Sequence, residues 1–146
     1  MSLSTDRFFY DALRTEGDIV ELTDGRIFNP AREDIDEKED RIPYIIITLD
    51  GTQNVPTDKD AQGEGRLDTD TISVLCVAED RTSLANLAEL ARRTLRKALV
   101  DFGEDEAVEY GFSITDYAFA GGAVQFDPGK PCCFQTLTYS VENEIF

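Results

Sequence analysis

Hydrophobic residues recur along this protein with two different periods, which predict its helices and its strands. Near the N-terminus, residues 4–6 supply helix-capping side chains, and apolar residues at helical spacing follow them. This pattern predicts a helix that ends at about Thr15. Its inward-facing residues are Phe9, Ala12 and Leu13.

A hairpin is predicted directly after this helix. Asp18–Leu22 and Arg26–Phe28 have the length and composition of two short strands, and Asp24-Gly25 lies between them. Asp-Gly is a strong signal for a tight turn, because both residues tolerate a positive φ.

Two apolar segments predict the centre of a sheet. Tyr44–Leu49 follows Pro43 as a run too continuous for simple alternation. It favours a strand buried on both faces, or buried on one face and covered by a neighbouring subunit on the other. Thr71–Ala78 is the second such strand.

The polar segment Asp50–Asp68 separates these two strands, and it is long for a loop without secondary structure. We expect it to be either disordered or an arm that becomes ordered against a partner. Lys59 and Arg66 are candidate interface residues on this flexible or arm-like loop.

A long helix is predicted over Thr82–Phe102, with Asp80 or Thr82 as its N-cap and Gly103 at its C-terminal end. Leu90 lies off its apolar stripe and is a candidate contact residue. The stripe, which must pack on the sheet, consists of Leu84, Leu87, Ala88, Ala91, Leu95, Ala98, Leu99 and Phe102.

The C-terminal part of the sequence predicts closing strands at Glu109–Ala120, Ala123–Asp127 and Cys132–Asn143. In the last of these, mostly apolar residues alternate with mostly hydroxyl-bearing residues. This period of two is typical of a strand in a sheet whose two faces differ. The predicted fold class is α+β. It has a mixed or antiparallel β-sheet of about four to six strands, packed against an N-terminal helix and one long central helix. We expect a single domain over residues 1–146.

The formal net charge is −16, from 14 basic and 30 acidic residues. Affinity for nucleic acid depends mainly on Lys and Arg that displace counterions from phosphates, so we expect no sequence-specific nucleic-acid binding. An acidic surface maintains solubility and repels phosphate. The sequence shows neither a basic-then-apolar leader nor a membrane-length apolar run, so we expect cytoplasmic synthesis and no membrane association.

One basic patch interrupts this acidity. Arg92, Arg93, Arg96 and Lys97 all lie in the second half of the predicted long helix. One interpretation is a favourable interaction with the C-terminal end of the helix dipole. The other is docking against a carboxylate-rich surface of a neighbouring copy, for which the acidic segment Ala31–Arg41 is a candidate.

The sequence lacks several arrangements of residues that define known catalytic sites. The sequence has no histidine, which excludes Ser-His-Asp and Cys-His arrangements. Cys76, Cys132 and Cys133 do not have the spacing of metal ligands, and we interpret them as small buried hydrophobic residues. Lys130 is followed by proline, and no P-loop surrounds it. We expect no catalytic residue, no cofactor and no metal.

Two acidic segments are candidates for chemistry. Residues 58–63 resemble the opening of an EF-hand loop, but Thr69 stands where the last ligand should be glutamate. Residues 34–40 contain enough Asp and Glu to supply the two catalytic carboxylates of a glycosidase, although nothing in the sequence places them in a pocket. A small acidic hydrolase or binding domain is therefore one alternative class, and an acidic protein that mimics DNA is another.

Five stretches, taken in order, make up a recognisable pattern: the N-terminal helix, Gly25–Pro30, Pro43–Ile47, Ile72–Val77 leading into Leu84–Leu99, and Phe134–Val141. This pattern resembles the tail-terminator or tail-completion proteins of long-tailed phages, also called minor tail proteins. Two features depart from that family: the acidic segment Ala31–Arg41 is longer, and the strand before the long helix ends Val77-Ala78-Glu79, where the family more often has an aromatic residue.

The resemblance implies a non-enzymatic phage or prophage subunit that assembles into a ring, commonly a hexamer. The ring would cap the tail tube, stop its polymerisation and join it to the head. Implied partners are sister copies, the tail tube protein and the head–tail connector protein. The protein would occupy the host cytoplasm during assembly and then the virion tail or neck.

The acidic surface would suit a channel that DNA crosses, because carboxylates do not bind phosphate. Another head–tail joining or neck protein is the alternative function. The candidate interface residues are Arg92, Arg93, Arg96, Lys97, Tyr44, Lys59 and Arg66.

Overall fold

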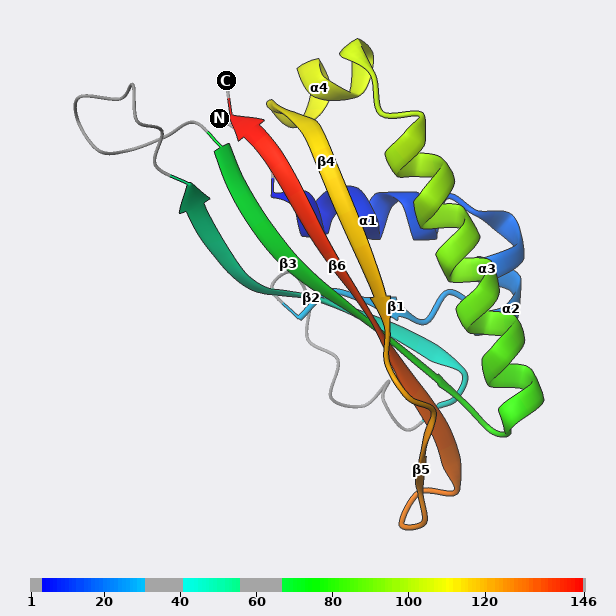
Figure 1. The fold of residues 1–146 in the computed structure, drawn as a ribbon. Helices are drawn as coiled ribbons and strands as arrows, with labels where there is room; N and C mark the ends of the chain where they lie inside the picture. The colour runs from blue at the N-terminus through cyan, green and yellow to red at the C-terminus, as the bar shows by residue number, and fades with distance from the viewer. Residues whose placement is uncertain (1–3, 31–40, 56–66, 146) are drawn as a thin grey trace.

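Helices and strands follow one another nearly as predicted, but α2 (Gly17–Thr23) occupies the place of a predicted strand and α4 (Glu104–Tyr110) is a helix that was not predicted (Figure 1). The structure, a computed structural model, describes residues 4–30, 41–55 and 67–145. The elements are α1 (Thr5–Arg14), α2 (Gly17–Thr23), β1 (Ile27–Phe28), β2 (Tyr44–Val55), β3 (Leu67–Ala78), α3 (Arg81–Val100), α4 (Glu104–Tyr110), β4 (Phe112–Gly121), β5 (Gln125–Asp127) and β6 (Cys132–Ile145).

The six strands form one mixed sheet in the order β1-β2-β3-β6-β4, and β5 pairs with the first residues of β6. Only β1 runs parallel to its neighbour, while the other described pairs are antiparallel. Helices α1 and α3 pack on the same face of this sheet (Figure 1). The predicted fold class is therefore confirmed.

Helix α3 buries its predicted stripe against the sheet. Asp80 caps its N-terminus as predicted, because its carboxylate accepts a hydrogen bond from the Ser83 amide at 2.8 Å. That hydrogen bond lowers the pKa of Asp80. Leu90 is partly buried and packs against the core, and its role as a contact residue stays a prediction. The buried residues of the stripe are Leu84, Leu87, Ala88, Ala91, Leu95 and Leu99.

The hairpin predicted for residues 18–28 is wrong. Residues 17–23 form α2, and β1 then pairs in parallel with β2. Asp24 and Gly25 do adopt positive φ angles of 53° and 77°, but they terminate a helix. The amides of Gly25 and Asp24 donate back to the carbonyls of Val20 and Glu21, which is the Schellman arrangement of a helix C-terminus.

Gly103 also has a different role from the one predicted. It is the N-cap of α4, and its amide donates to the Glu106 carboxylate at 3.1 Å. Three acidic residues occupy the first turn of α4, where they interact favourably with the helix dipole. Gly111, at φ 82°, ends α4, so the following strand begins at Phe112 rather than at residue 109.

The polar loop predicted at residues 50–68 is shorter than expected. Strand β2 continues to Val55 and β3 begins at Leu67, and the two strands pair along their full length with one irregularity between Leu49 and Gly51. The register of the neighbouring strand, rather than local hydrophobicity, keeps these polar residues extended. Lys59 and Arg66 lie outside the described residues, as do the acidic segment 31–40 and the EF-hand-like residues 58–63.

A buried polar cluster fixes α1 over the β2–β3 hairpin. The Asp70 carboxylate accepts hydrogen bonds from the hydroxyls of Thr5 and Thr52, both at 2.6 Å, and from the Asn143 amide at 3.2 Å. Asp70, Thr5 and Asn143 are all buried. Beside them, Asn29 donates to the Asp6 carboxylate at 2.8 Å. The Asp70 carboxylate thereby joins polar groups from α1, β2, β3 and β6.

We predict that Asp70→Ala lowers the free energy of unfolding by about 2–4 kcal/mol, because it removes the acceptor of the buried Thr5 hydroxyl and one of the two acceptors of the buried Asn143 amide. Urea denaturation followed by circular dichroism measures this change. Asp68→Ala is the matched control, since Asp68 accepts a hydrogen bond from the exposed Asn54 amide; we expect a loss below about 0.5 kcal/mol there. Equal losses in the two variants would contradict the structural role of Asp70.

Leu95→Asp should prevent folding. Leu95 is completely buried, and a carboxylate there would lose its hydration without gaining a partner. The expected loss exceeds about 5 kcal/mol, which approaches the whole stability of a domain of this size. Ala85→Asp, at an exposed position of the same helix, should cost about 1 kcal/mol or less. A cooperative thermal transition in Leu95→Asp would show that this part of the core is wrong.

Candidate interaction surfaces

One depression in the described part of the protein gathers several carboxylates. It has a volume of about 520 Å³, lies between α1, α3 and α4, and its lining includes Asp11, Asp101, Glu106 and Glu109. Asp11 accepts a hydrogen bond from the Tyr110 hydroxyl at 2.6 Å and has an ion pair with Arg7. The bond between Asp11 and Tyr110 joins α1 to α4, which is a structural role.

The described residues contain no cluster of three metal-ligating side chains. None of the described helices has the length and the hydrophobicity that crossing a bilayer requires.

The three cysteines are buried, as predicted, and unpaired. Burial raises the pKa of the Cys76 thiol from 9.0 to about 12. A thiol nucleophile needs a lowered pKa and solvent access, and Cys76 has neither. Its environment instead fits a small hydrophobic core residue.

The basic patch forms a continuous exposed surface on α3. Arg92, Arg93, Arg96 and Lys97 are all exposed, and we call them the basic surface. The guanidinium of Arg92 lies 4.5 Å from the centre of the Phe119 ring on β4, and this cation–π contact fixes its direction. Phe119 packs in turn on Tyr139 at 5.0 Å between ring centres.

The helix dipole accounts for only a small part of this basic surface. Of its four residues, only Lys97 lies in the last turn of α3. A dipole effect fades beyond the last turn, so Arg92 and Arg93 gain little from it. Arg93 has one long ion pair, with Glu89 at 3.9 Å, and both side chains are well exposed. Such a pair contributes about 0–1 kcal/mol.

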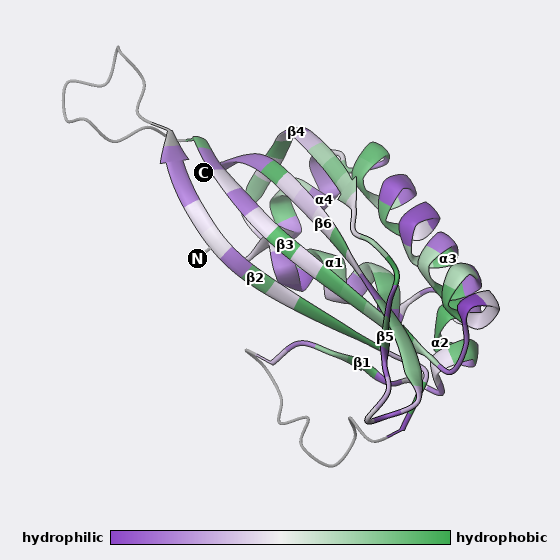
Figure 2. Cartoon of the chain, turned by 60° about the horizontal axis from the view of Figure 1, so that its bottom comes forward, coloured by the Kyte–Doolittle hydropathy of each residue, from purple (hydrophilic) through white to green (hydrophobic). Residues whose placement is uncertain are grey.

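The opposite face of the sheet is not covered by any described helix, and we call it the open face (Figure 2). Strand register assigns its residues, because side chains alternate between the two faces. Its composition changes along the strands, from apolar at the end near β1 and β5 to acidic at the end where β6 finishes. The apolar residues are Tyr44, Ile46, Leu75, Val77 and Phe134, a hydroxyl-rich zone contains Thr48, Ser73, Thr136 and Thr138, and the acidic residues are Asp116, Glu142 and Glu144.

Tyr44 therefore lies on a different surface from the basic residues of α3, although the sequence analysis lists all of them as candidate interface residues. It begins β2 on the open face and is half-buried. The β2 run alternates after all: Ile45 and Ile47 are fully buried, whereas Ile46 keeps partial exposure. Burial on both faces, the first of the two predicted possibilities, is wrong for this strand. Cover by a neighbouring subunit remains a prediction.

Two exposed apolar side chains, which the sequence analysis did not name as interface candidates, lie in or next to β5. Phe126 is 62% exposed and Val124 is 40% exposed. They border a depression of about 430 Å³ at the N-terminus of α3 that also includes Asp80 and Arg81. Phe126 lies in the short strand β5, between turn residues. An aromatic residue in such a strand can belong either to the core or to a contact surface, so the sequence alone did not identify it.

We predict that Cys76 resists alkylation by iodoacetamide at pH 8 in the native protein. Its thiolate fraction there is about a thousandfold lower than that of a thiol with the ordinary pKa of 9.0, and the side chain is inaccessible. Mass spectrometry after a timed reaction measures the modification. The control in urea should modify all three cysteines. Rapid native labelling of Cys76 would contradict its burial.

Comparison with known proteins identifies the fold. No protein-family profile matches the sequence, and no curated protein matches it. Among solved structures, a chain from the virion of a native gene transfer agent particle is similar, with a TM-score of 0.64 and 10% sequence identity. The match covers 95% of this chain and 93% of that chain. The two proteins therefore share one fold over nearly the whole of both sequences.

Proposed function

We propose that this protein is a structural component of a phage-like virion, and specifically a tail terminator. The observation that carries this proposal is the fold, which coincides over nearly the full length of both proteins with a chain of a gene transfer agent virion. The two folds correspond as wholes, rather than through one shared fragment.

The surfaces of the described residues support an assembly role. A β-sheet with helices on one face leaves a second face that must be hydrated or covered, and here that face has an apolar end around Tyr44, Leu75 and Phe134. Half-buried aromatic and aliphatic residues gathered on one open face are typical of protein–protein contacts. The basic surface on α3 is a second, separate candidate contact.

In the proposed role, copies of the protein form a ring at the end of the tail tube. The ring stops further addition of tube subunits and offers its other side to the head connector. A net charge of −16 suits this place, because DNA passing through an acidic ring is not retained by its phosphates. Function then depends on interface residues, and the protein is not an enzyme.

Deletion of the gene in a strain that produces the particles tests this role. We expect tails of uncontrolled length without attached heads, because nothing stops tube polymerisation or joins the tail to the head. Electron microscopy of purified particles measures tail length, and complementation with the wild-type gene is the control. Tails of normal length would contradict the terminator role.

The same experiment distinguishes the second candidate, a head–tail joining or neck protein. The fold match supports that candidate too, since the matching chain comes from a whole virion rather than from an isolated tail. A neck protein predicts free tails of normal length and unattached heads after deletion. Normal, infectious or gene-transferring particles would exclude both candidates.

A further inference from the structure

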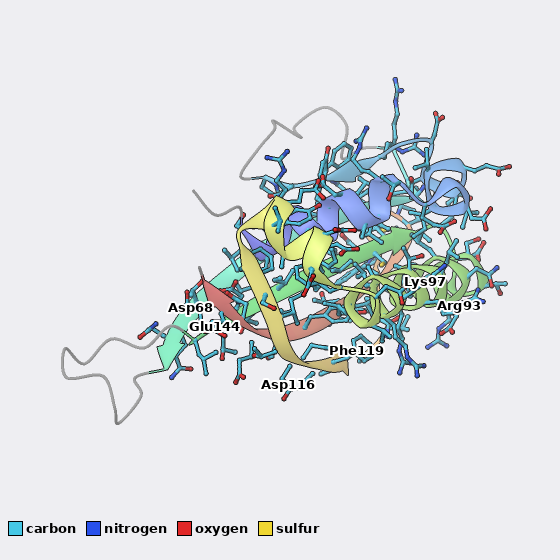
Figure 3. All side chains as sticks on the ribbon, turned by 90° about the horizontal axis from the view of Figure 1, so that it is seen from above. Asp68, Arg93, Lys97, Asp116, Phe119 and Glu144 are labelled. Carbon is cyan, nitrogen blue, oxygen red and sulfur yellow. The ribbon has the colours of Figure 1, made fainter. Side chains whose placement is uncertain are left out.

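Two surfaces of opposite charge lie apart on the molecule. The first is the basic surface on α3. The second, which we call the acidic end, lies on the open face where β6 finishes, and it contains Asp116, Glu142 and Glu144. In Figure 3, Asp116 and Glu144 lie away from Arg93 and Lys97, which project from α3 at another side of the molecule.

The basic surface is only weakly neutralised within the protein. Arg92 is held by the Phe119 ring and Arg93 by the long contact with Glu89. Among the described residues, Arg96 and Lys97 form no ion pair. Four exposed cations on neighbouring turns of one helix repel one another, and an acidic partner would relieve that repulsion.

The acidic end contains an unfavourable arrangement of its own. Asp116 on β4 lies directly opposite Glu142 on β6 in the strand register. Like charges in this cross-strand position destabilise a sheet. Thr115, at an irregularity of β4, donates a hydrogen bond to the Glu142 carboxylate at 2.8 Å and fixes its position. Within the described residues, no Lys or Arg forms an ion pair with Asp116 or Glu142, so an external cation would lower the free energy of this pair.

We propose that the basic surface of one copy docks onto the acidic end of the next copy. This deepens the proposed function, on which it rests, by naming the two surfaces that join neighbouring subunits. It replaces the acidic segment 31–40, which lies outside the described residues, with a surface built on paired strands.

The separation of the two surfaces determines the kind of assembly. A single copy cannot bring Arg93 and Lys97 to its own Glu144, because the paired strands hold the groups on different sides (Figure 3). Two different patches that bind each other between copies make a head-to-tail interface, which closes into a ring when the rotation between copies allows it. With a net charge of −16, other orientations of approach are repulsive.

Charge exchange tests the docking. Arg93→Glu with Lys97→Glu reverses two of the four charges of the basic surface and makes its net charge zero, and Asp116→Lys with Glu144→Lys reverses two of the three charges of the acidic end. Each double variant alone should weaken self-association at least about tenfold in size-exclusion chromatography with light scattering. An equimolar mixture of the two should recover part of the lost association, because the new carboxylates of one variant then meet the new ammonium groups of the other. Circular dichroism confirms that each variant is folded.

A matched control separates local docking from total charge. Arg81→Glu with Lys130→Glu changes the net charge from −16 to −20, the same change as in Arg93→Glu with Lys97→Glu, because each reversal removes one positive and adds one negative charge. Arg81 lies at the other end of α3, and Lys130 follows β5. We expect this control to associate like the wild type.

The proposal fails if the wild type stays monomeric at all concentrations, if the acidic-end variant associates normally, or if the mixture does not recover. A basic-surface variant that loses tail-length control in the complementation assay while self-associating normally would also overturn it, since the partner would then be a different acidic protein. If the association assays contradict the docking but deletion still gives tails of uncontrolled length, only the docking proposal is rejected and the terminator role is retained. Normal tails on deletion reject the terminator role independently of the docking.

Discussion

The structure depends on one constraint: the sheet is covered by described helices on only one of its faces. The α3 stripe, with Leu84, Leu95 and others fully buried, packs on β3 and β6, and α1 completes the cover over β2. Burial of each large apolar side chain contributes about 1.5–3 kcal/mol, so this single layer provides most of the stability. The Asp70 cluster then fixes where α1 lies, because the buried Thr5 hydroxyl of α1 donates its hydrogen bond to the Asp70 carboxylate of β3.

One-sided cover has a direct consequence for function. The other face retains half-buried apolar residues at one end and carboxylates at the opposite end, and β4 remains an edge strand whose outer backbone groups have no neighbouring strand in the described sheet. Natural proteins protect such edges, and β4 carries an irregularity and the charged Asp116, which discourage indiscriminate pairing. A surface of this kind suits a protein that meets a defined neighbour.

Wrong predictions arose at residues whose local preference fits two structures. Asp24 and Gly25 tolerate positive φ angles, which serve a hairpin turn and a helix C-terminus equally well; the buried Ile19 and the pairing of β1 with β2 decided in favour of the helix. Gly103 fits both the end of α3 and the start of α4, and the three acids that follow it favour the start. Residues 50–54 lack apolar side chains, so only the pairing of this segment with β3 made it a strand.

The sequence by itself determined the fold class, the amphipathic stripe of α3, its Asp80 cap, the burial of the cysteines and the basic patch. Each of these depends on spacing or residue type within a short segment, and such information is local. It did not determine which charges face one another: the acidic end is assembled from β4 and β6, whose residues are far apart in the sequence. Only the strand register brings Asp116 opposite Glu142, and only the packing of α3 places Arg92 over Phe119, because both contacts depend on tertiary structure.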